Sequence, residues 1–298
     1  MKSYKPSKLD ESVTKIITLL RELFLHPVTI NACLHYNYGI LRHRNWGDDL
    51  NIYLLDKLWR KPLSYIYTSI LAARKHPDNY IAIGSTLAML SNQNAIVWGA
   101  GVIDENERLD IPPKKILAVR GPKTRQWLLD KGVECPEIYG DPAMLLAEIY
   151  TPKKTARRYK LGIIPHYDDF DHPSLQLLKN DPEVLFIRME GYKNWLGVID
   201  DIASCDYIAS SSLHGLIMAE AYGVPNLWIE ISGNLMGGHF KFHDFFLSIG
   251  VDRDKPYLIK IDTTKEELLN KKDQYQKGHI DLSHLKSVSP FPINLSKI

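Results

Sequence analysis

The chain has 298 residues, of which 45% are hydrophobic and 24% are charged, an ordinary globular composition with room for one large core or two smaller ones. Its 37 basic and 35 acidic residues give a formal net charge of +2. This balance gives no support to a dedicated nucleic-acid binder, which needs a concentrated basic footprint, so a few placed groups must hold any anionic ligand.

The cysteines and the apolar segments indicate where the protein resides. Cys33, Cys135 and Cys205 are spaced too widely for a zinc site. We expect Cys33 and Cys205 to be buried free thiols, as in a reducing compartment. Residues 1–6 lack the apolar core of a secretory signal, and no apolar run reaches the roughly 18 residues that cross a bilayer. We therefore expect a soluble, cytoplasmic protein with at most peripheral membrane contact.

In chain order, the first half opens with an amphipathic helix over residues 10–25, where Val13, Ile16, Ile17, Leu20 and Phe24 recur at helical spacing. We expect it to pack on the first domain, because the segment is not basic enough to favour a membrane-surface helix. Strand and helix then alternate with short turns. The predicted strands are 28–34, 80–83, 95–98 and 116–119, and the predicted helices are 48–59 and 122–131.

A polar, basic segment over residues 151–158 is typical of an interdomain linker, and the alternation then restarts. The predicted strands are 161–164, 184–188, 207–209 and 226–229, and the predicted helices are 195–204 and 213–222. This order predicts an α/β protein with two Rossmann-like, doubly wound domains, 1–152 and 153–298. Beyond about residue 275 we expect a tail that is loosely structured or packs back on the body.

The first strand of each half ends in the dipeptide His-Tyr, at His35-Tyr36 and at His166-Tyr167. Doubly wound sheets bind ligands at the carboxyl ends of their strands, so two facing halves would present both dipeptides to one crevice. Imidazole changes charge near neutral pH, which makes a histidine there a candidate general acid or base. We favour His166, because Pro165 and the following turn fix its direction.

Two predicted helix starts have the composition of anion sites. Residues 210–215 place Ser211, Ser212, His214 and Gly215 where backbone N–H groups point outward. The alternative is an N-cap cluster with a buried His214. Residues 120–122 place Arg120 at a strand end and Gly121 before a proline that opens a helix, where a guanidinium can hold a carboxylate or phosphate. A surface helix start is the alternative there.

Residues 45–51 open the second predicted helix and carry Asp48 and Asn51. These side chains are either capping groups or ligands of a sugar hydroxyl, and the sequence leaves both interpretations open. The acidic residues of 168–172 fit neither an EF-hand nor a zinc motif, so we expect no metal. Residues 99–101 are too short for a dinucleotide fingerprint, which disfavours NAD.

Six motifs occur in an order that resembles the polysaccharide pyruvyl transferases, and in particular the bacterial exopolysaccharide ketal-pyruvate transferases. Each motif is unspecific alone, but six in order are fairly specific, and the resemblance runs from about residue 30 to 250. They are Asn45-Trp-Gly-Asp-Asp-Leu-Asn51, Trp98-Gly-Ala-Gly101, Ala118-Val-Arg-Gly-Pro-Lys-Thr124, Tyr139-Gly-Asp-Pro-Ala143, Ile164-Pro-His-Tyr167 and Ser210-Ser-Ser-Leu-His-Gly215.

The resemblance implies a GT-B-like fold, with the active site between two domains. It implies phosphoenolpyruvate as co-substrate, no other cofactor, and a glycan acceptor linked to polyprenyl diphosphate at the inner face of the cytoplasmic membrane. The product would be a cyclic pyruvate ketal on a hexose. The chain departs from the family at Ser212, where many members carry arginine. Either Lys241 or Arg120 compensates, or this subgroup binds its donor differently.

A mechanism follows from the resemblance and from the chemistry of these residues. The carboxylate and phosphate of the donor would bind Arg120 and Gly121 on one side and Ser211, Ser212 and Gly215 on the other. His166 or His214 would protonate the methylene carbon, and Asp48 would accept a proton from the sugar. We assign the acceptor to His35, Asn37, Asn51 and Lys241, and expect residues 241–244 to form a loop near the site or a surface helix.

Two other functions fit the same sequence. One is a GT-B glycosyltransferase that uses a nucleotide sugar, because a fold does not determine its chemistry. The other is a glycan- or phosphate-binding protein without catalysis, which the serine at position 212 keeps open.

Overall fold

The computed structural model describes residues 7–153 and 158–298, and in this part of the chain two parallel sheets of five strands each form the framework. The strand order is β4-β1-β5-β6-β7 in the first sheet and β9-β8-β10-β11-β12 in the second. If the strands of each sheet are counted in chain order, both sheets read 2-1-3-4-5. The two halves therefore share one doubly wound topology, whose ligand site lies where the strand order reverses.

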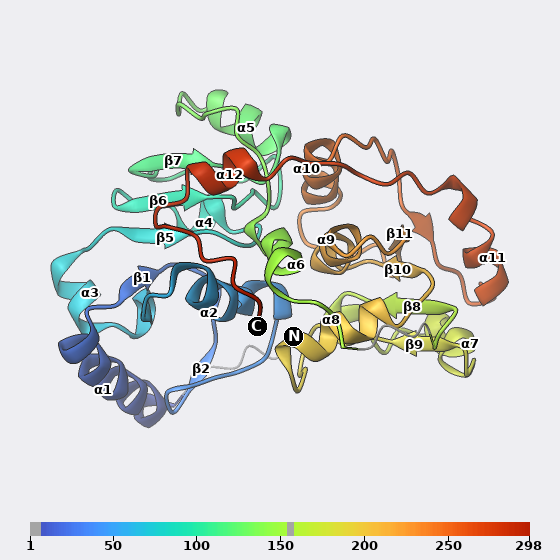
Figure 1. Cartoon of the computed structure of the whole chain (residues 1–298), viewed down its shortest axis with the longest axis horizontal. Coiled ribbons are helices and arrows are strands. Elements are labelled where there is room, and N and C mark those ends of the chain that lie inside the picture. The colour runs from blue at the N-terminus through green and yellow to red at the C-terminus, as the bar shows by residue number, and fades with distance from the viewer. Residues whose placement is uncertain (1–6, 154–157) are drawn as a thin grey trace.

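The first half extends to residue 149, and its elements are blue to green in Figure 1. Its strands are β1 (Val28–Ile30), the hairpin β2 (Tyr36–Asn37) and β3 (Ile40–Leu41), β4 (Leu63–Tyr65), β5 (Asn79–Ile81), β6 (Ala95–Trp98) and β7 (Lys115–Ala118). Its helices are α1 (Lys8–Leu25), α2 (Trp46–Trp59), α3 (Ile70–Lys75), α4 (Leu87–Leu90), α5 (Pro122–Leu129) and α6 (Leu146–Ile149).

The second half repeats the pattern and lies beside the first (Figure 1). Its strands are β8 (Leu161–Ile164), β9 (Val184–Phe186), β10 (Ile208–Ser210), β11 (Asn226–Glu230) and β12 (Tyr257–Leu258). Its helices are α7 (Gln176–Lys179), α8 (Trp195–Ala203), α9 (Leu213–Ala221), α10 (Phe240–Ser248), α11 (Lys265–Leu269) and α12 (Ser283–Ser287).

The central strands are buried on both faces, which is why they are short apolar runs without alternation. Every residue of β8 and of β10 is buried. The α/β, doubly wound prediction is confirmed by the two sheets. Of the two alternatives for residues 241–244, the loop is wrong and the helix is right, because these residues lie in α10. The helix is not confined to the surface, since its Phe242, Phe245 and Phe246 are buried in the core.

Helix α1 packs on the first half as expected, but through its polar face. Asp10, Thr14 and Glu22 are buried, whereas Phe24 is 80% exposed. The polar side chains form specific bonds: the Ser64 hydroxyl donates to Glu22 (2.6 Å), and backbone N–H groups of the β2–β3 turn donate to Asp10 and Thr14 (both 2.8 Å). The apolar stripe that the sequence suggested would be buried therefore faces outward.

The C-terminal segment packs back on the body, which was one of the two expectations for it. It crosses from the second half to the first, where α12 lies beside the first sheet (Figure 1). The Trp98 indole donates to the carbonyl of Leu285 (2.9 Å), and the Phe291 ring lies 5.2 Å from that of Trp59. Residues 280–298 are therefore part of the packing of the first half.

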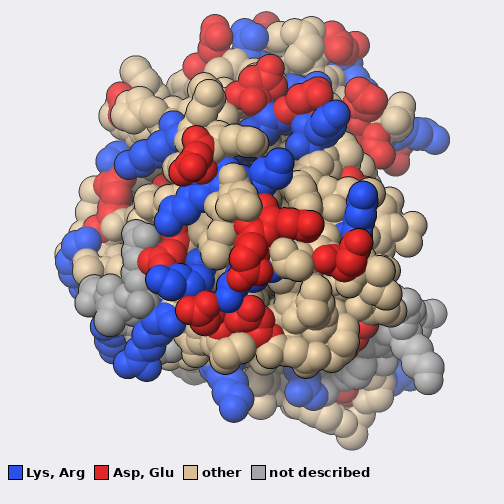
Figure 2. Space-filling model, turned by 90° about the vertical axis from the view of Figure 1, so that its right-hand side faces the viewer, with Lys and Arg blue, Asp and Glu red and all other residues tan. Residues whose placement is uncertain are grey.

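Two predictions fall partly or wholly on residues that the structure does not describe. These are the N-terminal residues 1–6 and residues 154–157 of the predicted linker. Among the helices of the described ranges, none is both long and apolar enough to cross a membrane. On the face shown in Figure 2, acidic and basic side chains are interspersed, in keeping with the near-neutral net charge.

Candidate functional site

A cavity of about 300 Å³ lies between the two halves. Its lining includes residues from the segments that follow β1, β5, β8 and β10, the four strands at which the strand order reverses in the two sheets. Such switch points are the ligand sites of doubly wound sheets. Further lining residues follow β6, β9 and β11. The cavity is lined by Cys33, His35, Arg44, Asn45, Asp48, Ser85, Thr86, Met89, Ile103, Glu107, His166, Tyr167, Met189, Glu190, Ser212, Leu213, His214, Met236 and Lys241.

Six of the residues predicted from the sequence line this cavity: His35, Asp48, His166, Ser212, His214 and Lys241. His35 and His166 both follow the first strand of their sheet, which explains why the repeated His-Tyr dipeptide marks one place. His166 is anchored by its backbone N–H, which donates to the hydroxyl of Ser211 (2.8 Å). Ser211 is buried and positions His166.

The start of α9 reaches the cavity through Ser212, Leu213 and His214. Its first backbone N–H groups and the helix dipole favour an anion at this point. The His214 ring packs on Gly47 of α2, where an added Cβ would lie 1.9 Å from Nδ1. Burial, with the charges of Arg120 and Lys241, lowers the pKa of His214 to about 3, so its imidazole is neutral at physiological pH.

Asp48, in the first turn of α2, lines the cavity with its carboxylate. The side-chain amide of Asn45 donates to it (2.7 Å) and fixes its orientation. Burial and, to a lesser degree, the nearby Asp141 raise its pKa to about 7, while Lys241 opposes this shift. A carboxyl group with a pKa near 7 can exchange a proton under physiological conditions.

Two cationic side chains line the cavity with Asp48. Lys241, on α10, is 8% exposed, and its Nζ donates to the carbonyl of Met236 (3.3 Å). Burial and the charge of Arg120 lower its pKa to about 8. Arg44 contributes a guanidinium that lies 3.7 Å from Glu190 on the opposite half. Lys241 is one of the two residues expected to compensate for Ser212, and it lies in the right place.

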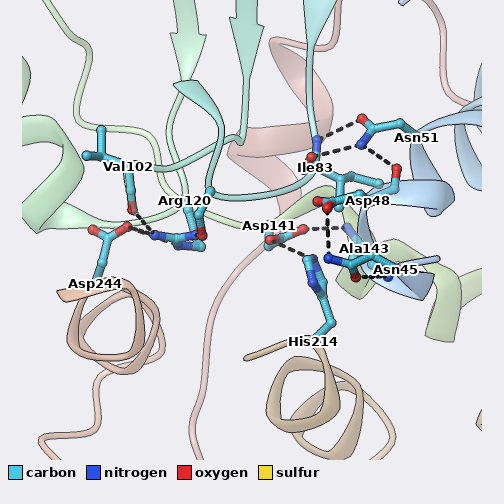
Figure 3. A network of polar contacts seen from close by, with 12 residues as sticks. Asn45, Asp48, Asn51, Ile83, Val102, Arg120, Asp141, Ala143, His214 and Asp244 are labelled. Atoms are coloured by element: carbon cyan, nitrogen blue, oxygen red, sulfur yellow. Dashed lines mark hydrogen bonds and ion pairs between the residues drawn. The ribbon is translucent and has the colours of Figure 1, made fainter. Parts of the chain in front are cut away.

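Asp141 lies behind His214 and was not predicted as a site residue (Figure 3). Its Oδ2 is 3.9 Å from Nε2 of His214, and neither atom has a hydrogen-bond partner among the described residues. Its Oδ1 accepts from the backbone N–H of Ala143 (2.9 Å). Burial raises the pKa of Asp141 to about 6. The pair places a buried carboxylate behind a neutral imidazole.

Arg120 does not reach the cavity. It is fully buried and binds Asp244 of α10 (Nε–Oδ2 3.0 Å), the carbonyl of Val102 (2.9 Å) and the hydroxyl of Ser85 (Figure 3). Asp244 also accepts from the backbone N–H of Thr124 (2.8 Å). The start of α5 therefore already has an anionic partner from the protein itself, and Arg120 compensates the charge of that partner.

Three further predicted residues serve packing at this point. Asn51 is fully buried and bonds both the N–H and the carbonyl of Ile83 (3.0 and 2.8 Å), so α2 is fastened to the end of β5. Gly121 and Gly215 permit close approach, because an added Cβ would lie 1.9 Å from the Asp244 carbonyl oxygen and 2.4 Å from Ser210 Oγ, respectively. The side chain of Asn37 lies outside the described part of the structure.

Some cavity residues had no signal in the sequence. Arg44 and Glu190 stand in no recognisable motif, and Glu107 lies in a loop. Asn45 and Ser85 could have been found, because the first opens a noted motif and the second follows a predicted strand. The acidic turn 168–172 is used locally: Asp171 pairs with Lys179 (3.0 Å), and the His172 ring caps the turn at Ser174.

Comparison with known proteins agrees with this geometry. The family model for polysaccharide pyruvyl transferase matches residues 13–233. The chain is 29% identical over 225 residues to the uncharacterized protein L143 of Acanthamoeba polyphaga mimivirus, covering 74% of this chain and 76% of that protein. It is 26% identical over 238 residues to the succinoglycan biosynthesis protein ExoV of Rhizobium meliloti (strain 1021), covering 78% of this chain and 70% of that protein.

The matched region contains both switch points and most of the cavity wall, apart from Met236 and Lys241. A family model that covers most of the chain, together with a cavity built from the motifs that suggested it, settles the classification. The chain belongs to the polysaccharide pyruvyl transferase family.

Proposed function

We propose that this protein transfers a pyruvyl group from phosphoenolpyruvate to two hydroxyls of one hexose in a lipid-linked polysaccharide repeat unit and releases phosphate. The product is a cyclic ketal. The observation that carries the proposal is a cavity at both switch points in which Lys241, Arg44 and the start of α9 face the carboxylate of Asp48. Cationic groups of this kind suit a donor that carries both a phosphate and a carboxylate.

The proposal includes a cytoplasmic location at the membrane surface, a GT-B-like arrangement of two domains that meet near residue 152, and no cofactor. Within it, Lys241, Arg44 and Ser212 bind the donor. This replaces Arg120 and Gly121 at the donor, because Arg120 is engaged with Asp244, and it moves Lys241 from the acceptor residues to the donor residues. His35 lies at the acceptor side of the cavity.

The chemical steps balance as follows. A proton passes from a histidine, for which we favour His166, to the methylene carbon, and C2 becomes electrophilic. A sugar hydroxyl bonds to C2 and gives its proton to Asp48, and phosphate leaves as its bond to C2 breaks. The second hydroxyl then bonds to C2 and closes the ring, and its proton returns to His166. Burial and Lys241 lower the pKa of His166, but a bound donor anion favours the imidazolium. The neutral His214 orients the donor.

The test is release of inorganic phosphate from phosphoenolpyruvate in the presence of hexose acceptors, with mass spectrometry of the ketal. We expect Asp48→Asn and Lys241→Met to lower kcat/KM at least a hundredfold. Asp56→Asn, an exposed carboxylate on the same helix, is the matched control and should retain full activity. Full activity in Asp48→Asn and Lys241→Met would contradict the proposal.

Thermal protection separates the alternatives. Phosphoenolpyruvate should raise the unfolding midpoint of the wild-type chain but not that of Lys241→Met. Protection by a nucleoside diphosphate instead would indicate a glycosyltransferase. Protection by phosphoenolpyruvate without turnover on any acceptor would indicate a binding protein.

A further inference from the structure

A second cavity, of about 280 Å³, lies between α1 and the carboxyl ends of β1 and β4. The segment that follows β1 contributes lining residues to both cavities. Cys33 lines the first cavity, Leu34 and Tyr36 line the second, and His35 lines both. The two cavities therefore adjoin at His35, the residue that we place on the acceptor side.

One wall of the second cavity is aromatic. It is formed by Tyr36, Tyr65 and Tyr67. The rings of Tyr36 and Tyr65 stack with centroids 5.5 Å apart, and Tyr67 meets Tyr65 edge-on at 5.4 Å. Tyr67 is 60% exposed, so its ring offers an apolar surface to a ligand.

The opposite wall is polar and comes from α1, through Glu11, Thr14 and Lys15. The bonds from the β2–β3 turn and the contact between the hydroxyls of Thr18 and Thr68 (3.2 Å) hold this wall in place. Part of the polar face of α1 therefore lines the second cavity.

A hexose ring has an apolar face of C–H groups and a rim of hydroxyls, so its site needs an aromatic surface beside hydrogen-bond donors and acceptors. The second cavity offers both. The carboxylate of Glu11 beside the ammonium of Lys15 suits uncharged hydroxyls better than a phosphate, which Glu11 would repel. The chemistry of the walls and the junction at His35 thus indicate a neutral saccharide that continues from the first cavity.

We propose that the second cavity is a glycan subsite, which binds the sugar next to the hexose that receives the pyruvyl group. In this subsite the ring of Tyr67 packs on the sugar face, while Glu11 and Lys15 bind its hydroxyls. The inference rests on the proposed function for the identity of the reaction, but the subsite is tested separately. It makes the protein selective for acceptors longer than one sugar.

The experiment compares two acceptors with phosphoenolpyruvate held constant: the methyl glycoside of the hexose that turns over fastest, and a disaccharide that carries this hexose at its non-reducing end. We expect wild type to prefer the disaccharide. Tyr67→Ala should lower kcat/KM about tenfold for the disaccharide, and leave kcat/KM for the monosaccharide and KM for phosphoenolpyruvate unchanged. Phe24→Ala, on the outward face of α1, is the control and should change neither.

Equal losses on both acceptors, or no effect of Tyr67→Ala, would overturn the subsite. Tyr67→Phe, which keeps the ring, should behave as wild type. If no acceptor turns over, the proposed function fails, and saturation-transfer NMR with a panel of hexose disaccharides then tests the subsite alone. Saturation transfer that Tyr67→Ala abolishes and Phe24→Ala preserves would support it, and the absence of transfer in wild type would overturn it.

Discussion

At the scale of single residues, Asp48 and Lys241 form a coupled pair in the first cavity. Burial raises the pKa of Asp48 to about 7 and lowers that of Lys241 to about 8. Each of the two groups favours the charged form of the other. Because the pKa of Asp48 is lower than that of Lys241, both side chains are mostly charged in the range from about pH 7 to about pH 8.

We therefore expect three groups to shape the pH profile of kcat/KM. Asp48 must lose its proton to act as a base, so activity rises through pH 7. His166 must keep its proton to act as the acid, so its deprotonation contributes to the alkaline limb. Lys241 must keep its proton to hold the donor, so activity falls further above pH 8. Lys241→Arg should remove the fall near pH 8 and leave the contribution of His166, because arginine stays charged. Steady-state kinetics from pH 5.5 to 9.5 measure both limbs, and an unchanged alkaline limb in Lys241→Arg would contradict the assignment.

Arg120 is a second case in which the environment decides the role of a residue. Its guanidinium and the carboxylate of Asp244 are both fully buried, so removal of one partner leaves an uncompensated charge. We expect Arg120→Ala to cost about 3–5 kcal/mol of the free energy of unfolding. The double variant Arg120→Met with Asp244→Leu should recover at least half of that loss in denaturant titrations.

The double variant also separates structure from donor binding. If Arg120 acts only through the fold, the refolded double variant keeps a KM for phosphoenolpyruvate close to that of wild type. A KM raised more than tenfold in a stable double variant would return Arg120 to the donor site.

At the scale of elements, the ends of strands were the most predictable part of the site. The alternation of short apolar runs and helices predicted both sheets, and His35, His166 and Ser212 follow strands that meet at the switch points. Arg120 also follows a strand, yet it lies outside the cavity because β7 is at the edge of its sheet. Residues that follow strands can be assigned to one common site only when the order of the strands in the sheet is known.

Other elements depend on contacts that no local pattern contains. Helix α1 has an apolar stripe, but polar bonds to Ser64 and to the β2–β3 turn orient its other face inward. The carboxylate of Asp244 accepts the backbone N–H of Thr124 at the start of α5, although the two residues are 120 positions apart in the sequence. Sequence composition correctly marked the start of α5 as a place for an anion, but it does not indicate that the chain supplies that anion itself.

The packing of α2 on α9 gives a prediction at this scale. Gly47 lies against the ring of His214, and a methyl group there would overlap the imidazole. Gly47→Ala should cost about 1–3 kcal/mol by overpacking and displace His214 from the cavity. In the double variant with His214→Ala the overlap is gone, so the two effects should not add. Thermal unfolding of the four chains measures the coupling, and simple additivity would contradict it.

At the scale of the whole molecule, hydrogen bonds between side chains and backbone groups of the two halves hold them together. The Trp46 indole donates to the carbonyl of Trp195 (3.0 Å), Tyr192 donates to Asp49 (2.9 Å), and Tyr150 donates to Asp200 (2.8 Å). The C-terminal segment adds a further tie, because it leaves the second half and packs on the first. These contacts make the halves interdependent, so we expect them to unfold together.

The C-terminal tie can be tested with two phenylalanines. Phe291 is partly buried between the rings of Trp59 and Tyr80 (5.2 and 5.1 Å), whereas Phe24 on α1 is 80% exposed. Phe291→Ala should cost about 2–3 kcal/mol, somewhat less than a fully buried phenylalanine, and lower the unfolding midpoint by about 4–10 °C. Phe24→Ala should change it by less than about 2 °C.

The number of unfolding transitions in calorimetry tests whether the two halves unfold together. Calorimetry of Phe291→Ala should show one transition at the lower temperature, because loss of packing in the first half also weakens the bonds to the second. Two separate transitions, with only one shifted, would show that the halves unfold independently. Because the cavity is built from both halves, protection by phosphoenolpyruvate should then move the single transition as a whole, in Phe291→Ala as in wild type.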